Sequence, residues 1–354
     1  MADIREHLKH EPLVFDGGMG TYYAQKTNTR GKGVELANLQ SPDVVAGIHA
    51  EYLHAGAQAI KTNTFAANRI VYQGDDELVA QIIRAGWALA ERAAEPFGAY
   101  VFADIGPVIG LPPRDIAAEY RFLADTFLSC GATHFLFETN SSAEGLTETA
   151  AYIKAACPHA FVQISFTALP GGYTRDGFFA EDLVRAVAES GQVDAVGFNC
   201  VNGVRQMKEL LHHLKSVSLP LALMPNAGHP MVVDGRTFYE SAPEYFAETL
   251  AALVQDGVSI LGGCCGTTPE HIAALRRAIG TDRPVAERSP EPLNAVSSLY
   301  SATELTQQTS YLAVGERTNA NGSKAFRQRM LAGDLDGCVE IARAQTSQGA
   351  HVLD

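Results

Sequence analysis

Short apolar runs alternate with amphipathic stretches along most of the chain, and this repeat restricts the fold more than any other feature of the sequence. Each run is typical of a buried strand and each amphipathic stretch of a helix. The predicted strands are 13–15, 59–62, 100–103, 134–137, 161–165, 195–198, 221–224 and 258–261, and the predicted helices are 43–54, 77–94, 114–128, 143–156, 180–189, 204–215, 243–255 and 269–279. Eight βα units predict an α/β protein built as a closed (β/α)8 TIM barrel. An open doubly wound sheet is the alternative, but no GxGxxG motif follows the first strand.

The sequence also predicts how the chain is divided. Residues 1–280 hold the barrel, and residues 281–308 are rich in Pro, Ser, Thr and Glu, which is typical of a linker. Residues 309–354 contain another apolar run, a helical pattern over 324–348 and the start of a further strand at His351. We expect this last part to be the truncated start of a second barrel, and the chain to be a piece of a longer enzyme.

Charge and cysteine usage exclude some classes of protein. The net charge is −13, and no cluster of Lys and Arg offers a surface for nucleic acid. No apolar run approaches the roughly 20 residues of a membrane helix, and the first residues lack the apolar core of a signal peptide. The six cysteines are sparse and irregularly spaced, which suits a reducing compartment. We therefore expect a cytoplasmic protein without membrane or nucleic-acid partners.

Three of the cysteines follow predicted strands, at the end of a barrel where active sites lie. Cys200 follows the sixth strand, and Cys264 and Cys265 follow the eighth. Three thiolates with an open fourth position are typical of a catalytic zinc site. Adjacent side chains on a regular strand point to opposite faces, but Gly263 and Gly266 allow the backbone to leave strand geometry here. Inert packing and a redox-active Cys264–Cys265 disulfide remain as alternatives.

A zinc ion held by three thiolates suits a substrate thiol better than water, because it can keep that thiol ionised near neutral pH. This predicts a thiol nucleophile and an alkyl or methyl electrophile.

Other strand ends fit a small amino acid that carries the thiol. Backbone N–H groups of the turn with Gly17, Gly18 and Met19 can hold a carboxylate, although the turn can equally be an ordinary one. Asp16 and Glu138 can pair with an ammonium group, or Glu138 can simply precede a helix.

Three amides also follow predicted strands. These candidate substrate-binding residues are Asn63, Asn199 and Asn226. Each can contact the substrate or brace a loop, and both interpretations stay open.

Taken in order, the strand-end motifs resemble one family. The motifs are DGGMGT (16–21), TNTF (62–65), FET (137–139), GFNC (197–200), PNAG (225–228) and GGCCGT (262–267). This set resembles the homocysteine S-methyltransferase family. The resemblance implies that Cys200, Cys264 and Cys265 ligate Zn²⁺, and that the sulfur of homocysteine completes the tetrahedron. It also implies that Asp16 and Glu138 lie near the substrate amino group, with the glycine turn near its carboxylate. The family leads us to expect a less acidic residue at Asp104, so the role of Asp104 is open.

Residues 309–354 indicate which methyl donor is used. The segment GERTN (315–319) resembles the opening of the folate-binding barrel of cobalamin-dependent methionine synthases, although a generic turn before a helix is the alternative. The resemblance implies methylcobalamin, recharged from methyltetrahydrofolate, as the donor, with cobalamin-binding and folate-binding modules of the same longer enzyme as partners. The alternatives are a corrinoid-independent homocysteine S-methyltransferase using betaine or S-methylmethionine, a non-catalytic zinc or amino-acid-binding module, and a thiol redox protein.

Overall fold

The computed structural model describes residues 3–29, 33–169, 171–201, 203–211, 214, 217–233, 236–239, 241–280, 284–286, 294–297, 302–306 and 311–354. The chain forms two compact units, Met1–Pro290 and Glu291–Asp354. Each unit is described by itself.

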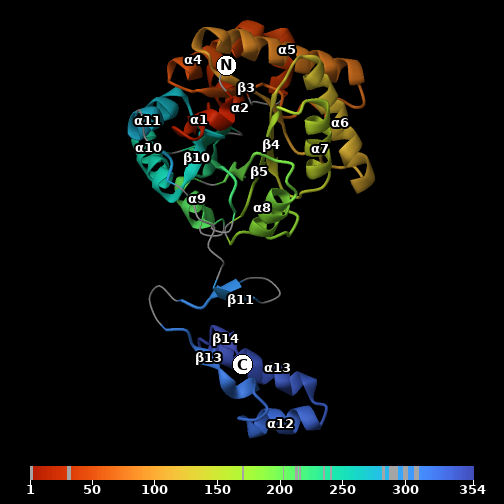
Figure 1. Ribbon diagram of the computed structural model, residues 1–354, viewed down its shortest axis with the longest axis vertical. Helices are drawn as coiled ribbons and strands as arrows, with labels where there is room; N and C mark the ends of the chain where they lie inside the picture. Colours follow the sequence, from red (N-terminus) through yellow and green to blue (C-terminus); the bar gives the residue numbers. More distant parts are fainter. Residues whose placement is uncertain are drawn as a thin grey trace. The chain divides into compact units, whose positions relative to one another are not determined.

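The first unit contains a closed ring of parallel strands (Figure 1). The strands are β1 (Leu13–Val14), β2 (Ala59–Lys61), β3 (Tyr100–Ile105), β4 (His134–Asn140), β5 (Phe161–Phe166), β6 (Ala195–Asn199), β7 (Leu221–Met224) and β10 (Val258–Leu261). They pair in the order β1-β10-β7-β6-β5-β4-β3-β2. A parallel bridge between Phe15 and Ala59 joins β1 to β2 and closes the ring. The predicted (β/α)8 fold is therefore confirmed.

Helices surround the strands on the outside of the ring (Figure 1). These are α4 (Pro42–His54), α5 (Asp76–Ala94), α6 (Pro113–Ser129), α7 (Leu146–Ala156), α8 (Ala180–Glu189), α9 (Val204–Leu211), α10 (Pro243–Ala252) and α11 (Pro269–Ile279). Helix α2 (Met19–Thr27) instead lies over the cavity at the carboxyl end of the strands. Two short helices, α1 (Ile4–His7) and α3 (Ala37–Gln40), are also described in this unit. Several starts are marked by proline at the first helical position, where its missing N–H costs nothing. The end predicted for the sixth helix, 212–215, lies largely outside the described residues.

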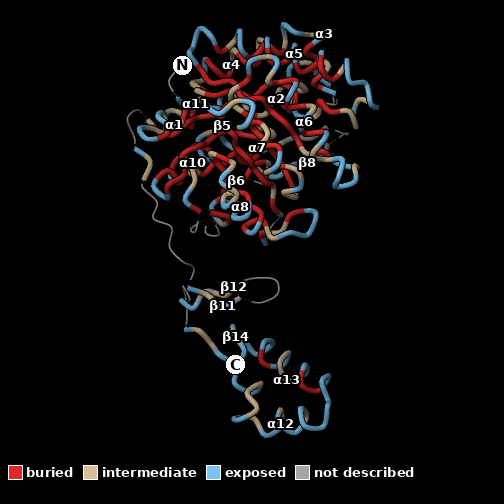
Figure 2. The backbone as a smooth tube through the Cα atoms, turned by 45° about the vertical axis from the view of Figure 1, so that its right-hand side comes forward, coloured by how far each residue is buried: buried red, intermediate tan, exposed pale blue. Residues whose placement is uncertain are grey.

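The interior of the ring is apolar at the amino-terminal end of the strands. Its buried side chains include Phe15, Phe102, Leu136, Phe161 and Ile260. Helix α1 covers this end, because Ile4 is buried in the same cluster. The buried backbone of the strands runs through the centre of the unit in Figure 2. Polar interior side chains are thereby concentrated at the other end, where the strands finish.

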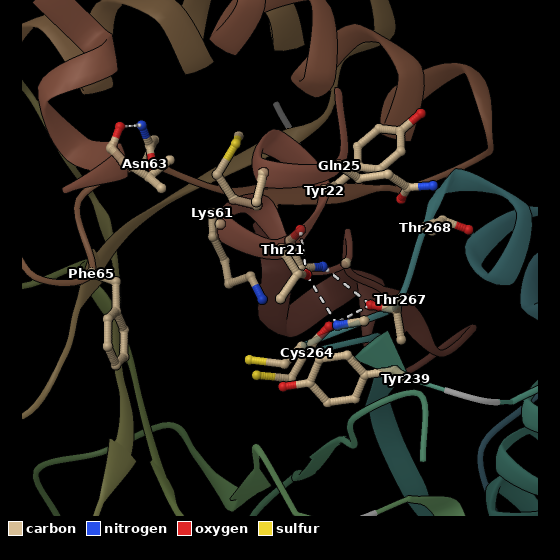
Figure 3. A pocket seen from close by; sticks show the side chains of 18 of the residues that line it. Thr21, Tyr22, Gln25, Lys61, Asn63, Phe65, Tyr239, Cys264, Thr267 and Thr268 are labelled. Atoms are coloured by element: carbon tan, nitrogen blue, oxygen red, sulfur yellow. Dashed lines mark hydrogen bonds between the residues drawn. The ribbon is translucent and has the colours of Figure 1, made fainter. Parts of the chain in front are cut away.

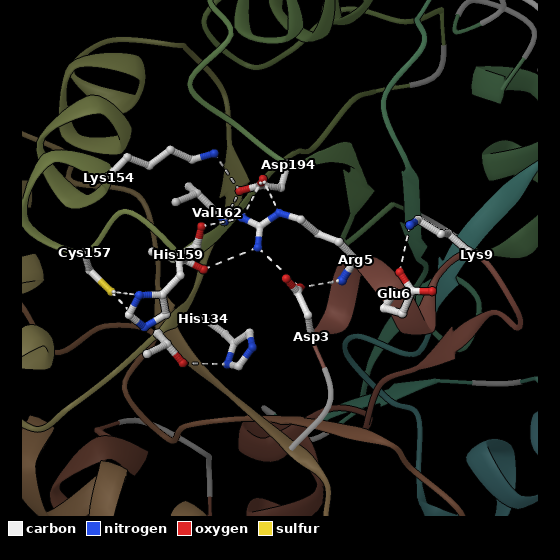
Figure 4. Close-up of polar contacts among 12 residues, drawn as sticks. Asp3, Arg5, Glu6, Lys9, His134, Lys154, Cys157, His159, Val162 and Asp194 are labelled. Atoms are coloured by element: carbon white, nitrogen blue, oxygen red, sulfur yellow. Dashed lines mark hydrogen bonds and ion pairs between the residues drawn. The ribbon is translucent and has the colours of Figure 1, made fainter.

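Arg5 fastens α1 to the barrel (Figure 4). Its Nη2 atom donates to Asp194 Oδ1 at 2.8 Å and to the Ala160 carbonyl oxygen at 2.7 Å. Asp194 also accepts the Val162 backbone N–H at 2.8 Å and pairs with Lys154 at 2.9 Å. Charge-assisted hydrogen bonds of this kind are about twice as strong as neutral ones. They hold the covering helix in place at the end opposite the polar layer.

An antiparallel hairpin, β8 (Pro230–Val233) and β9 (Arg236–Tyr239), is inserted between β7 and α10. The eightfold repeat does not predict it. Because the insertion follows the carboxyl end of β7, it brings Tyr239 to the same end of the barrel as the predicted site.

In the second unit, β13 (Val314–Gly315) pairs in parallel with β14 (Val352–Leu353). Helices α12 (Lys324–Leu331) and α13 (Leu335–Ser347) lie between them in the chain. The single helix predicted over 324–348 was wrong, because the chain breaks at Gly333 (φ +72°) and Asp334 caps a new helix. The unit also contains the antiparallel pair β11 (Ala295–Ser297) and β12 (Ala302–Glu304), inside the segment predicted as a linker. The remainder of that segment lies largely outside the described residues.

No helix in the described part of either unit is both long enough and apolar enough to span a membrane.

Candidate active site

The three predicted thiols meet at the carboxyl end of the barrel. The sulfur atoms of Cys200, Cys264 and Cys265 all lie within 4.8 Å of one another, and Cys200 Sγ is 3.9 Å from Cys265 Sγ. Thiolates that bind one tetrahedral zinc at about 2.3 Å lie about 3.8 Å apart. Within the described ranges this is the one group of His, Cys, Asp and Glu side chains with metal-binding spacing.

The backbone leaves strand geometry at both thiol positions. Cys200 follows β6 with φ +53°, which is unusual for a residue with a side chain. Cys264 and Cys265 lie beyond the end of β10 and are followed by Gly266 at φ +78°. Asn226 Oδ1 accepts the Cys265 backbone N–H at 3.0 Å. The predicted departure from strand geometry is confirmed, and the described hydrogen bond of the Asn226 side chain braces the cysteine turn.

The glycine turn after β1 packs directly against the cysteine turn. A Cβ atom on Gly18 would lie 2.7 Å from the Cys264 carbonyl oxygen, so only glycine fits without displacement. The Gly18 N–H donates to Thr267 Oγ1 at 3.1 Å, and Thr21 Oγ1 accepts the Gly266 N–H at 3.0 Å. The Gly18 N–H is thus used within the protein and does not project as a free donor.

Helix α2 begins at Met19, and its first turn lines the cavity beside the thiols. Gly18 provides no side-chain cap for that turn. The first N–H groups of a helix have no partner within the helix, and the helix dipole favours an anion there. A carboxylate site at this turn therefore belongs to the N–H groups from Met19 onward.

Two predicted carboxylates, Asp16 and Glu138, flank a lysine that sequence reasoning missed. Lys61 Nζ lies 3.7 Å from Asp16 Oδ1 and 3.9 Å from Glu138 Oε2. Burial raises the pKa of Asp16 to about 7 and that of Glu138 to about 7, although Lys61 opposes both rises. Burial alone would lower the pKa of Lys61, but Glu138 and Asp16 outweigh it and raise that pKa above its ordinary value.

Asp104 belongs to the same buried group, on the inner face of β3. Burial and the nearby Glu138 raise the pKa of Asp104 well above its usual range. Its Oδ1 atom has no hydrogen-bond partner among the described residues. Asp104 lines the cavity together with Lys61 and Glu138.

Of the three predicted amides, only Asn199 joins the parts of the site. Its Nδ2 donates to Glu138 Oε2 at 3.0 Å and lies 3.9 Å from Cys264 Sγ, and its Oδ1 accepts the Thr139 N–H at 2.7 Å. Asn63 also lines the cavity, but its Nδ2 donates to the Val34 carbonyl oxygen at 2.8 Å and to Asn38 Oδ1 at 2.9 Å. These bonds favour a loop-bracing role for Asn63.

The cavity that contains the thiols has a volume of about 770 Å³ (Figure 3). Gly17, Gly18 and Met19 form part of its wall, and Tyr239 lies beside the sulfur atoms. A Cβ atom on Gly266 would lie 2.2 Å from Tyr239 Cγ, so the ring rests on the glycine. Burial and the neighbouring Cys265 raise the pKa of Tyr239 above its ordinary value.

Lys61 and Tyr239 are two residues close to the thiols that the sequence did not single out. Lys61 had a detectable signal, because it lies two residues after the inward-facing Ala59 on the same strand and so shares its face. The sequence signal for Tyr239 was weaker and consisted only of the long connection between the seventh predicted strand and the following helix.

The fold and the thiol cluster define a (β/α)8 protein whose polar site lies at the carboxyl ends of its strands. The profile of one family, homocysteine S-methyltransferase, matches residues 13–279. The chain belongs to the homocysteine S-methyltransferase family, a family of methyltransferases, and the resemblance drawn from its six motifs is confirmed.

Curated relatives are longer than this chain. It is 35% identical to the methionine synthase of Mycobacterium tuberculosis over 388 aligned positions and 35% identical to that of Mycobacterium leprae over 391. Both alignments take in 100% of this chain and 32% of the relative. The chain thus spans about a third of the length of these relatives.

Solved structures share the barrel. The metallated form of the homocysteine methyltransferase MmuM from Escherichia coli superposes with a TM-score of 0.62 at 24% identity, covering 78% of this chain and 99% of that one. The apo form superposes with a TM-score of 0.60 at 26% identity, covering 78% and 98%.

Proposed function

We propose that this chain binds Zn²⁺ through Cys200, Cys264 and Cys265 and uses the site to activate homocysteine for methylation to methionine. The observation that carries the proposal is the convergence of three thiols on a cavity that Glu138 and Lys61 also line, with the buried Asp16 carboxylate 3.7 Å from the Lys61 ammonium nitrogen. Thiols that can bind a metal and carboxylates that can bind an ammonium group lie close together here, which suits a small amino acid with a thiol.

The donor set fits zinc, because sulfur spacings of this size agree with a tetrahedral ion. When bound, zinc would supply charge that lowers the pKa of a substrate thiol and keeps it ionised near neutral pH. The chain itself holds the thiol side chains in place through the Asn226 bond to Cys265 and the strained backbone at Cys200. The substrate sulfur then attacks the methyl carbon of the donor, and the broken bond leaves its electron pair on the donor.

The rest of the cavity positions the amino acid. Asp16 Oδ1 is buried and, among the described residues, accepts no hydrogen bond, so it has capacity for an ammonium donor. Glu138 is held by Asn199 at 3.0 Å and faces the same region. The first turn of α2, which begins at Met19, offers N–H groups to the substrate carboxylate.

We further propose methylcobalamin, recharged from methyltetrahydrofolate, as the donor, carried on a module outside this chain. The mycobacterial methionine synthases align with all of the chain, including the part after the barrel, whereas the MmuM structures cover 78%. The parallel β13–β14 pair joined by helices suits the first unit of another barrel. In this proposal residues 1–280 form the homocysteine barrel, 281–308 a linker and 309–354 the start of a folate-binding barrel. Cobalamin-binding and folate-binding modules of one longer enzyme are the partners, and the unpaired cysteines suit a cytoplasmic location.

Metal content and proton release test the first part of the proposal. The reduced protein should hold about one zinc per chain, Cys200→Ala should lose it, and homocysteine should release a proton on binding to the loaded protein only. Folded protein that takes up no zinc would contradict the mechanism. Methyl transfer should then be assayed with methylcobalamin, betaine and S-methylmethionine as separate donors. Turnover with betaine or S-methylmethionine alone would replace the cobalamin proposal with a corrinoid-independent enzyme.

A further inference from the structure

Lys61 is a buried cation that lines the cavity (Figure 3). Its side chain is 6% exposed, and one ammonium nitrogen lies within 4 Å of both Asp16 and Glu138. Among the described residues that line the cavity, Lys61 is the only lysine or arginine. Two carboxylates this close repel each other when buried, and a cation between them offsets that repulsion.

The carboxylates keep capacity for a second cation. The Lys61 distances of 3.7 and 3.9 Å are ion-pair distances and are too long for hydrogen bonds. Asp16 Oδ1 and Asp104 Oδ1 are buried and accept no hydrogen bond from the described part of the chain. Because a buried carboxylate oxygen without a donor is costly, these atoms mark a place for another donor group.

Lys61 also contacts the turn that carries two of the thiols. Its Nζ donates to the Gly263 carbonyl oxygen at 3.2 Å, directly before Cys264 in the chain. The same side chain therefore joins the two carboxylates, one just after β1 and one on β4, to the cysteine turn after β10.

We propose that Lys61 is a positioning residue that makes this site selective for thiols carrying an α-ammonium group. It keeps Asp16 and Glu138 together as acceptors for one further cation and fixes the distance from that cation to the cysteine turn. The inference rests on the proposed function, because it concerns how the same cavity recognises homocysteine.

Neutral substitution of Lys61 should remove the selectivity and leave the thiol site in place. Without the cation, the two buried carboxylates either separate or take up a proton, and each change removes an acceptor for the substrate ammonium. A ligand with the same thiol and carboxylate but no amino group does not use these acceptors. 4-Sulfanylbutanoate is such a ligand, since it is homocysteine without the amino group.

The experiment is calorimetric titration of the zinc-loaded chain with L-homocysteine and with 4-sulfanylbutanoate. The Kd for 4-sulfanylbutanoate divided by the Kd for L-homocysteine measures the selectivity. Lys61→Met should lower this ratio about tenfold or more, with the Kd for 4-sulfanylbutanoate unchanged within about threefold. Lys61→Gln is a second neutral variant in case Lys61→Met does not fold, and Lys26→Met removes a lysine from the Glu51 pair at the exposed surface of α2 as a matched control. Chelator competition verifies that each variant still holds zinc.

Three outcomes of the titrations would contradict the proposed role of Lys61. Equal weakening of both ligands would show that Lys61 acts only through the cysteine turn, and tighter homocysteine binding would show that Lys61 competes with the substrate. Either result, or unchanged selectivity, overturns the inference and leaves the proposed function standing. Failure of the wild-type chain to bind homocysteine overturns the proposed function and the inference together.

Discussion

Asn199 and Glu138 are joined by a hydrogen bond of 3.0 Å, and the same amide nitrogen lies 3.9 Å from Cys264 Sγ. One side chain on β6 therefore contacts both the carboxylate end and the thiol end of the cavity. We expect Asn199→Ala to weaken homocysteine binding about tenfold or more, because Glu138 loses its fixed orientation and the Thr139 N–H loses its acceptor. Titration calorimetry measures the effect.

Asn68→Ala is the matched control for Asn199, since Asn68 is also a buried amide but its side-chain oxygen holds a loop backbone away from Glu138 and the thiols. Its Oδ1 accepts the N–H groups of Ile70 and Val71 at 3.1 and 3.0 Å. This variant should lose about 1–3 kcal/mol of unfolding free energy and bind homocysteine normally. Unchanged binding in Asn199→Ala would contradict the coupling role.

Gly266→Ala should remove zinc from the site. The position has φ +78°, and a Cβ atom would lie 2.2 Å from Tyr239 Cγ, so the cysteine turn or the Tyr239 ring has to move. Gly98→Ala is the control, because Gly98 has φ +60° with no atom within 4 Å of the added Cβ. The control should lose about 1–2 kcal/mol of unfolding free energy and keep its zinc. Metal analysis measures the loss of zinc, and thermal unfolding measures the loss of stability. A Gly266→Ala protein that still holds zinc would show that the turn tolerates a side chain.

Asp16→Asn should stabilise the metal-free chain increasingly as the pH rises, while weakening homocysteine binding. Burial raises the pKa of Asp16 to about 7 in the folded state, whereas an unfolded aspartate titrates near about 3.9. The folded wild type therefore binds this proton more tightly, and it loses unfolding free energy between about pH 4 and about pH 7. Asparagine does not titrate, so the difference between the two proteins grows across that window and levels off above it.

Urea unfolding of both proteins at several pH values between about 5 and 8 tests this expectation. Asp256→Asn, at an exposed position, is the control and should show no comparable rise. A difference that shrinks with increasing pH would mean that Asp16 is stabilised as a carboxylate in the folded chain.

Arg5→Ala should destabilise the barrel without changing the site. The guanidinium group bonds Asp194 (Figure 4) and the Ala160 carbonyl oxygen. Both residues directly precede strands, so they lie at the end of the barrel opposite the thiols. Its loss should cost about 1–3 kcal/mol of unfolding free energy, with zinc content and homocysteine affinity unchanged. Lys9→Ala, which removes an exposed pair with Glu6 on the same segment, should leave the stability unchanged. Reduced zinc binding in Arg5→Ala would show that the two ends of the barrel are coupled.

The barrel was predictable because its signal is repeated and local. Each buried strand carries its own apolar run, and proline at helix starts such as Pro42 and Pro269 is readable without tertiary information. The thiols were predictable for a geometric reason, since the carboxyl ends of parallel strands converge at one end of a barrel. Cys200 and Cys265 are 65 positions apart in the chain, yet their sulfur atoms are 3.9 Å apart.

The roles of individual polar residues were less predictable. Asn63 and Asn199 are the same residue type near the carboxyl ends of two strands, and only the tertiary structure shows that Asn63 bonds Val34 while Asn199 bonds Glu138. Tyr239 depends on how an inserted hairpin folds back, which the βα repeat does not encode. The break at Gly333 was readable, because glycine followed by a capping aspartate ends one helix and begins another.

The three thiols follow strands that are synthesised at different times. Cys200 follows β6, whereas Cys264 and Cys265 follow β10, the strand that pairs with both β7 and β1 and completes the circle. A nascent chain that has emerged only as far as β7 therefore contains one of the three proposed zinc ligands. The full ligand set exists only after the last strand docks, so zinc uptake during translation would report the moment at which the barrel closes.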